Sequence, residues 1–300
     1  MAVVKLRLAG KEVDNLYRKF ELNVQNGPVP CIGYAWELEQ PRYIFCIIHG
    51  LGELAGRYDR MNSYLAKANI ASVSMDLRGH GLTGGKRGHC APRELILTDI
   101  DQLIETAQAM YPGVPIIFYG HSLGGNIALD YKSRGKHSDV PVAYIISAPW
   151  LILKETPSPM LRKMVFFLSK IAPSFAIKSS IDENILGHPD SVKPYQDHPL
   201  VHDKISMLTA REGLEIGEAI VSGTHRDNGG SKGKPWLLMH GTDDRICDFK
   251  GSQALYARTP ENCTFIPWEG YYHEIHNGNE SVRGEEVIKR MIQWVLELQD

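Results

Sequence analysis

The stretch VPIIFYGHSLGGN, residues 114–126, decides how the chain is expected to fold. An apolar run ends at a glycine, Ser122 follows in the pattern Gly-x-Ser-x-Gly, and helical spacing begins near Gly125. Glycines two positions before and after the serine allow the backbone to turn sharply between a strand and a helix. We therefore predict that the hydroxyl of Ser122 projects from the end of a strand, beside a helix N-terminus that favours developing negative charge.

On both sides of this stretch, short apolar runs alternate with helical patterns over most of the chain. The runs do not alternate apolar with polar residues, which is typical of parallel strands covered on both faces. They read YIFCIIHG (43–50), IASVSMDL (70–77), VAYIISAPW (142–150), PWLLMHG (235–241) and CTFIPWEG (263–270). The sequence therefore predicts an α/β fold with a mostly parallel, doubly wound sheet.

Two departures from this alternation are expected. Near the N-terminus, the runs Val3–Leu8, Phe20–Val24 and Cys31–Glu37 indicate antiparallel strands at one edge of the sheet. From about residue 150 to about residue 225, six prolines interrupt helical pieces and no convincing strand is present. We interpret this part as an inserted helical cap, which divides the chain into a first core part (1–149), the cap (150–225) and a second core part (226–300).

The most informative piece of this insertion is a helix expected over Met160–Ile171. Its apolar residues share one face, its basic residues lie opposite, and Phe166 falls among the basic ones. Two interpretations are open. The apolar face packs on the core below it, or the helix is a basic amphipathic helix that also rests on lipid.

A serine nucleophile requires a base oriented by a carboxylate. After the run PWLLMHG, the Gly-x-x-Asp spacing from Gly241 favours Asp244 as the carboxylate, with Asp243 and Asp248 as alternatives. After the last apolar run, the loop EGYYH supplies His273 as the base. Apart from His276, the remaining histidines are expected to be solvated or structural.

The oxyanion hole is expected to combine two backbone N–H groups. One belongs to Leu123, directly after the nucleophile, and the other to Leu51 in the glycine-rich turn HGLGE (49–53). Ser122, Asp244 and His273 then follow one another in the chain order Ser, Asp, His that is typical of α/β-hydrolases.

Composition excludes several other classes of protein. The formal net charge is −2, so no basic excess is available to neutralise nucleic-acid phosphates. Five cysteines with no Cys-x-x-Cys pair indicate neither a disulfide framework nor a zinc site.

His198 and His202 stand four apart with Asp203 next to them, but no third ligand is apparent, so we expect no metal and no cofactor. No apolar stretch is long enough to cross a membrane, and we expect a cytoplasmic protein, with peripheral membrane contact through helix 160–171 as an open alternative.

Taken in order, the motifs HGLGE, DLRGHG, GHSLGG, HGTDDRICD and EGYYH resemble those of the monoacylglycerol lipase and lysophospholipase group of α/β-hydrolases. The resemblance covers most of the chain. It implies the α/β-hydrolase fold and a glycerol pocket lined by Glu53, Arg57, Tyr195 and His276. Leu123 stands where methionine is common in the group, and Cys247 matches a cysteine position of its animal members.

The resemblance implies a serine hydrolase that cleaves monoacylglycerols, a class of small lipid esters, to fatty acid and glycerol through an acyl-enzyme. A lysophospholipase or a broader carboxylesterase would need the same catalytic groups. A hydrolase-fold protein that binds a lipid or a partner without catalysis is the alternative from another class.

Overall fold

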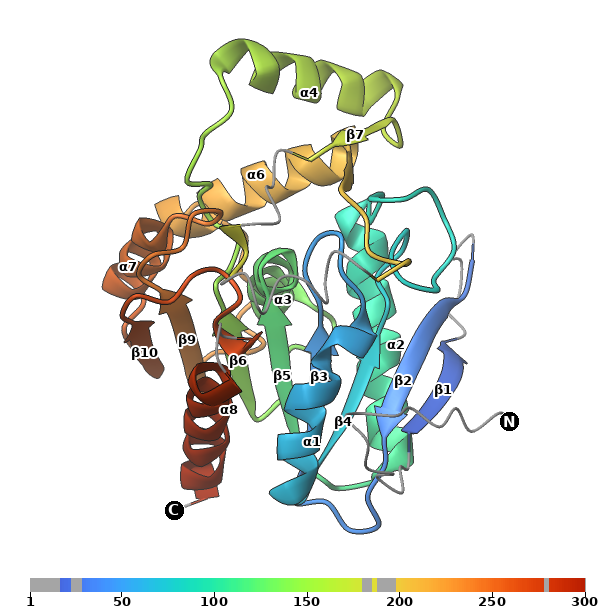
Figure 1. Cartoon of the computed structure of the whole chain (residues 1–300), viewed down its shortest axis with the longest axis vertical. Coiled ribbons are helices and arrows are strands. Elements are labelled where there is room, and N and C mark those ends of the chain that lie inside the picture. Colours follow the sequence, from blue (N-terminus) through green and yellow to red (C-terminus); the bar gives the residue numbers. More distant parts are fainter. Residues whose placement is uncertain (1–16, 23–28, 180–184, 188–197, 278–280, 300) are drawn as a thin grey trace.

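The computed structural model describes residues 17–22, 29–179, 185–187, 198–277 and 281–299, and its centre is a mostly parallel sheet (Figure 1). In the described residues the sheet has eight strands in the order β1-β2-β4-β3-β5-β6-β9-β10. Strand β2 pairs antiparallel with β1 and β4, and the other neighbours pair parallel. The strands are β1 (Tyr17–Leu22), β2 (Cys31–Trp36), β3 (Tyr43–Ile48), β4 (Ile70–Met75), β5 (Ile116–His121), β6 (Ala143–Ser147), β9 (Trp236–Gly241) and β10 (Cys263–Trp268). The predicted fold class and the antiparallel edge are confirmed, while the run Val3–Leu8 lies outside the described residues.

Helices cover both faces of this sheet. They are α1 (Asp59–Lys67), α2 (Arg93–Met110), α3 (Leu123–Arg134), α7 (Phe249–Arg258) and α8 (Ser281–Leu296), with short 3₁₀ turns at Ala55–Tyr58, Ile275–Asn277 and Glu297–Gln299. Successive strand residues point to opposite faces. In β3, Phe45 and Ile47 join the core under α1 and α8, whereas Cys46 and Ile48 join the core under α2 and α3. Apolar residues on both sides explain why these runs show no polar alternation.

The turn from β5 into α3 is tightly packed. A Cβ atom at Gly120 would lie 2.2 Å from the carbonyl oxygen of Gly124, and a Cβ atom at Gly124 would lie 2.3 Å from that of Ile48. Both neighbours are backbone atoms, which cannot swing aside as a side chain can. The two glycines flanking Ser122 are therefore required by the close approach of α3 to β5 and β3.

The segment between β6 and β9 rises above the carboxyl ends of the strands (Figure 1). It contains α4 (Pro159–Ile171), β7 (Ala176–Lys178), β8 (Lys204–Ser206) and α6 (Met207–Ser222). Strands β7 and β8 pair antiparallel in a separate small sheet. The expectation that this segment holds no strand was therefore wrong, because three-residue strands are too short to leave an apolar pattern.

Helix α4 exposes the face that one interpretation of the sequence assigned to the core. The exposed fractions of Met160, Phe167 and Ile171 are 79%, 62% and 64%. Phe166 was expected on the basic, solvent-facing side of the helix, but it is half-buried. Its ring centre lies 5.1 Å from the Arg162 guanidinium and 5.3 Å from the Arg211 guanidinium on α6. Packing against α6 thus buries Val165 and holds the Phe166 ring beside two cations, while most of the other apolar residues of α4 face outward.

None of the helices in the described residues is both long enough and apolar enough to cross a membrane.

We expect Gly124→Ala to destabilise the fold, because the new methyl group would meet the Ile48 carbonyl oxygen. Such overpacking costs at least about 1–3 kcal/mol of unfolding free energy, which denaturant titration followed by circular dichroism would measure. Gly56→Ala is the control, since a Cβ atom there meets nothing closer than 3.6 Å. Equal stabilities of the two variants would contradict this account of the turn.

Candidate active site

Ser122 connects β5 to α3 in a strained backbone conformation. Its φ of 56° and ψ of −119° lie in a region that residues other than glycine rarely adopt. The carbonyl oxygen of Ser122 accepts hydrogen bonds from the amides of Asn126 and Trp150, at 3.0 and 2.9 Å. These bonds hold the turn, and the serine hydroxyl faces the carboxyl ends of the neighbouring strands.

A chain of hydrogen bonds joins three residues from three strand ends. His273 Nε2 lies 2.8 Å from Ser122 Oγ, and His273 Nδ1 lies 2.7 Å from Asp244 Oδ2. A carboxylate only accepts, so Nδ1 carries the proton and Nε2 accepts the hydrogen bond of the serine hydroxyl. This is the arrangement in which an imidazole can remove a proton from serine.

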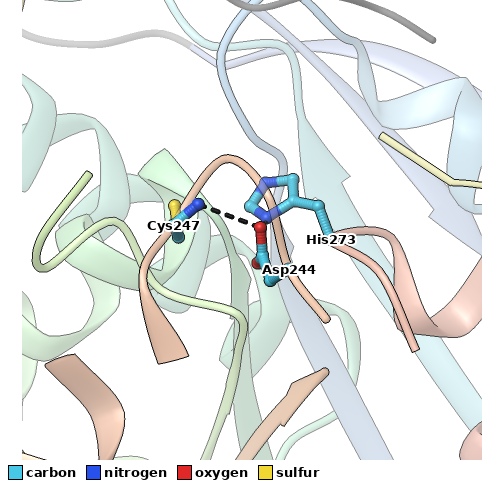
Figure 2. Close-up of side chains that lie close together, drawn as sticks. All are labelled: Asp244, Cys247 and His273. Carbon is cyan, nitrogen blue, oxygen red and sulfur yellow. Dashed lines mark hydrogen bonds and ion pairs between the residues drawn. The ribbon is translucent and has the colours of Figure 1, made fainter. Parts of the chain in front are cut away.

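Asp244 is the carboxylate that the fold brings to His273. Its Oδ1 accepts hydrogen bonds from the amides of Ile246 and Cys247, at 2.7 and 2.9 Å, and Figure 2 shows the latter beside the His273 ring. Asp243 is exposed, and Asp248 caps α7 by accepting from the Lys250 amide. The two alternatives named from the sequence therefore do not contact His273.

Charge and burial act in opposite directions on this pair. Burial raises the pKa of Asp244, but His273 and His240 outweigh it and hold the pKa well below its ordinary value. Burial lowers the pKa of His273, but Asp244 outweighs it and the net pKa is raised. An ionised Asp244 thus strengthens His273 as a proton acceptor.

The expected oxyanion donors lie on the turns next to Ser122. Leu123 is the first residue of α3, so its N–H has no acceptor within the helix. The turn that carries Leu51 is close as well, because a Cβ atom at Gly50 would lie 3.0 Å from Ser122 Cβ. His49 fixes this turn: Nε2 accepts from the Leu77 amide at 2.9 Å, and Nδ1 donates to the Gly50 carbonyl at 2.7 Å.

Glu53 and Arg57 belong to a buried ion network. Arg57 donates to Glu53 Oε2 at 2.8 Å and makes a bidentate pair with Glu274 at 2.6 and 2.8 Å. Glu53 Oε1 also accepts from the Gly50 amide, at 2.5 Å, and from the Tyr58 hydroxyl, at 3.1 Å. Burial raises the pKa of Glu274, but Arg57 outweighs it and lowers the pKa to about 2.

His276 lies beside this network, with both ring nitrogens unpartnered within the part of the chain that the structure describes. Its ring stacks on Tyr58 at 5.2 Å and meets His121 edge-on at 4.8 Å. Burial lowers the pKa of His276 to about 4, so the ring is neutral near pH 7. The fourth residue expected at the glycerol pocket, Tyr195, lies outside the described residues.

One group of three potential metal ligands is present among the described residues, and it overlaps the site. The ligand atoms of Asp244, Cys247 and His273 lie within 4.8 Å of one another (Figure 2). Burial and nearby Asp244 hold the pKa of the Cys247 thiol well above its ordinary value, so it stays protonated, whereas metals bind the thiolate. A metal would also displace the proton that joins His273 to Asp244. His198 and His202 do not belong to the group; His202 Nε2 instead faces the Gly79 carbonyl at 3.0 Å.

Three residues at the site were not identified from the sequence as functional. Glu274 follows His273 directly, and its partner Arg57 is more than two hundred positions away. Tyr58 follows Arg57 and hydrogen-bonds Glu53. His240 is the penultimate residue of the apolar run PWLLMHG, where a polar residue on a buried strand was an available signal.

Comparison with known proteins gives the family of the chain. Residues 39–280 match the Hydrolase_4 family, described as serine aminopeptidase, S33. The chain belongs to this family. It is an α/β-hydrolase of the lipase and esterase kind, as its relatives indicate.

Three relatives illustrate the range of similarity. A monoacylglycerol lipase of Mycolicibacterium smegmatis is 29% identical over 260 residues, which cover 85% of this chain and 89% of the lipase. An uncharacterized abhydrolase domain-containing protein of Dictyostelium discoideum is 35% identical over 84% of this chain, which spans only 26% of that protein. The crystal structure of Paleococcus ferrophilus monoacylglycerol lipase superimposes with a TM-score of 0.77, at 30% identity over 88% of this chain and 98% of that one.

We expect Arg57→Met to destabilise the α/β-hydrolase, because it leaves two buried carboxylates without their cation. Breaking a buried pair in this way costs about 3–5 kcal/mol of unfolding free energy. Because folding lowers the pKa of Glu274 to about 2, its contribution is present near neutral pH and is lost as the pH falls from about 4.5.

Denaturant titrations at pH 7 and at decreasing pH would measure both effects. Lys136→Met is the control, because Lys136 is 68% exposed and makes only a long ion pair with Glu105. A loss in Arg57→Met as small as that of the control would contradict the buried network.

Proposed function

We propose that this α/β-hydrolase cleaves the ester bond of monoacylglycerols, with Ser122 as the nucleophile. The observation that carries the proposal is the hydrogen-bonded chain from Ser122 Oγ through His273 to Asp244. The similarity to lipases whose names specify monoacylglycerol supports the choice of substrate.

In the first half of the reaction, Ser122 Oγ attacks the ester carbonyl while His273 Nε2 accepts its proton. The imidazolium that forms is stabilised by Asp244. The negative charge that develops on the carbonyl oxygen is bound by the N–H groups of Leu51 and Leu123. His273 then returns the proton to the departing glycerol, which leaves an acyl group on Ser122.

In the second half, water takes the place of glycerol. His273 removes a proton from this water, which attacks the acyl carbonyl under the same two N–H groups. Ser122 recovers its proton and the fatty acid leaves. No cofactor is needed for either half.

The charge beside the site favours glycerol over a phosphate head group. Glu53 and Glu274 carry two negative charges and Arg57 carries one positive charge, so this network has a net charge of −1. A phosphate would be repelled, whereas a glycerol hydroxyl can hydrogen-bond a neutral imidazole such as His276. We assign the glycerol pocket to Glu53, Arg57, His276 and, from the sequence, Tyr195.

We expect long-chain monoacylglycerol to release fatty acid faster than lysophosphatidylcholine or diacylglycerol, with matched acyl chains. Ser122→Ala should lose at least about 1,000-fold of kcat, because the acyl-enzyme cannot form. Liquid chromatography of released fatty acid would measure both. A lysophospholipid preference would contradict the glycerol pocket, and activity that survives in Ser122→Ala would contradict the mechanism.

We also propose that residues 150–225 act as the cap over the site and that α4 touches a membrane from which substrate enters. The outward residues of α4 form a continuous apolar face next to three basic residues, Arg162, Lys163 and Lys170. Such a helix lies in the interface of a bilayer.

All five cysteines are free, which supports a reducing, cytoplasmic compartment for this peripheral protein.

We expect Phe167→Asp to weaken liposome binding, because it places a charge on the exposed apolar face of α4. Phe167 is 62% exposed, so the fold and the hydrolysis of a soluble short-chain ester should be unchanged. Sedimentation with vesicles that contain anionic lipid would measure binding. Tyr256→Asp on α7 is the control, and equal sedimentation of the two variants would contradict the membrane role of α4.

A further inference from the structure

A second histidine contacts Asp244 at the same carboxylate oxygen as His273. His240 is the penultimate residue of β9, and its side chain is fully buried. Its Nε2 lies 2.9 Å from Asp244 Oδ2, the same oxygen that accepts from His273. Its Nδ1 lies 2.7 Å from Ser252 Oγ on α7.

The neighbours of His240 determine where its proton lies. Nε2 faces two acceptors, Asp244 Oδ2 at 2.9 Å and the Cys247 carbonyl oxygen at 3.2 Å. Neither of these atoms can donate, so Nε2 carries a proton. Ser252 can serve as the partner of Nδ1, and the ring is further held edge-on against Phe249 at 5.7 Å.

All the hydrogen-bonding positions of the Asp244 carboxylate are therefore filled. Oδ1 accepts from two backbone amides, and Oδ2 accepts from two imidazoles. His273 is the donor that the proposed mechanism uses, and the two amides belong to the turn that carries Asp244. His240 is the additional donor, and it shares its acceptor oxygen with the base.

We propose that His240 is a positioning residue which, within the serine-hydrolase function proposed above, fixes Asp244 Oδ2 and limits how strongly it attracts the His273 proton. A carboxylate oxygen that accepts from a second donor has less charge to offer the first. His240 thereby sets the pH at which His273 becomes a free base.

The direction of the effect follows from this competition. Without the His240 donor, Asp244 holds the imidazolium form of His273 more strongly, so a higher pH is needed to free the base. The carboxylate also loses one anchor and can rotate, which lowers kcat. Removal of His240 should therefore shift the acid limb of kcat/KM upward and reduce the plateau.

Other charged and titratable groups also face His273. Glu53 and Glu274 raise its pKa through their charges, and the His121 ring lies 4.9 Å away. His276 and Arg57 lie in the same network. These groups are the same in wild type and in every variant used below, so they do not account for a difference between them.

The experiment is the pH dependence of kcat/KM for a soluble short-chain ester. His240→Phe keeps a ring and removes the donor, whereas His240→Gln keeps a donor at similar reach. Met239→Ala is the matched control, because Met239 is the buried neighbour on β9 and belongs to the core on the opposite face of the sheet. Far-ultraviolet circular dichroism and thermal unfolding report whether each variant folds.

We expect the acid-limb midpoint of His240→Phe to rise by about half a pH unit or more, since a carboxylate oxygen that loses one donor binds the remaining one more strongly. His240→Gln should return the midpoint toward that of wild type. Met239→Ala should lose stability but keep the wild-type midpoint. The downfield proton resonance of the hydrogen bond between His273 and Asp244 should move in His240→Phe and stay in place in Met239→Ala.

A His240→Phe midpoint equal to that of wild type would overturn the role of His240 while leaving the proposed hydrolase intact. A midpoint that moves equally in Met239→Ala would also overturn it, since loosened packing would then be the cause. If His240→Phe does not fold, His240→Leu combined with Ser252→Ala removes the donor and its orphaned partner together, and the same midpoint decides. A wild-type protein without esterase activity would instead overturn the proposed function, and this inference with it.

Discussion

The site depends on keeping one buried carboxylate ionised. Asp244 is 1% exposed, and an isolated charge at that depth would take up a proton instead. Two backbone amides and two imidazoles supply the donors that prevent this. They come from the ends of β9 and β10, so both strand ends must be in place before the carboxylate can act on His273.

The sheet provides that placement. Parallel strands place their carboxyl ends at the same end of the sheet. Apolar residues on both faces of the sheet hold the strands between two layers of helices. The glycines around Ser122 let α3 approach β5 and β3 without a side chain between them. The strained φ of Ser122 is held by this packing, since the residues on either side cannot relax without moving the helix.

A second buried network joins the turn after β3 to the loop after β10. Glu53, Arg57 and Glu274 connect the turn at residues 49–53 to the segment that carries His273, so the two halves of the chain share one electrostatic unit. In the proposed function, its excess negative charge lies at the pocket for the glycerol part of the substrate. The same residues therefore serve stability and the proposed preference for an uncharged head group.

The α/β class and the candidates Ser122, Asp244 and His273 could be predicted from the sequence, because they depend on local patterns: apolar runs, glycine turns and the residues that follow them. For the carboxylate, the sequence left Asp243 and Asp248 open as alternatives. The tertiary structure was needed to show which residues meet: Arg57 pairs with Glu274 across 217 positions, and the turn after β9 brings Asp244 back onto His240. It also showed that α4 turns most of its apolar residues outward, since helical periodicity defines a face but not the direction in which it points. Local patterns report what a segment can form, whereas partners brought together by folding set its orientation and its charge environment.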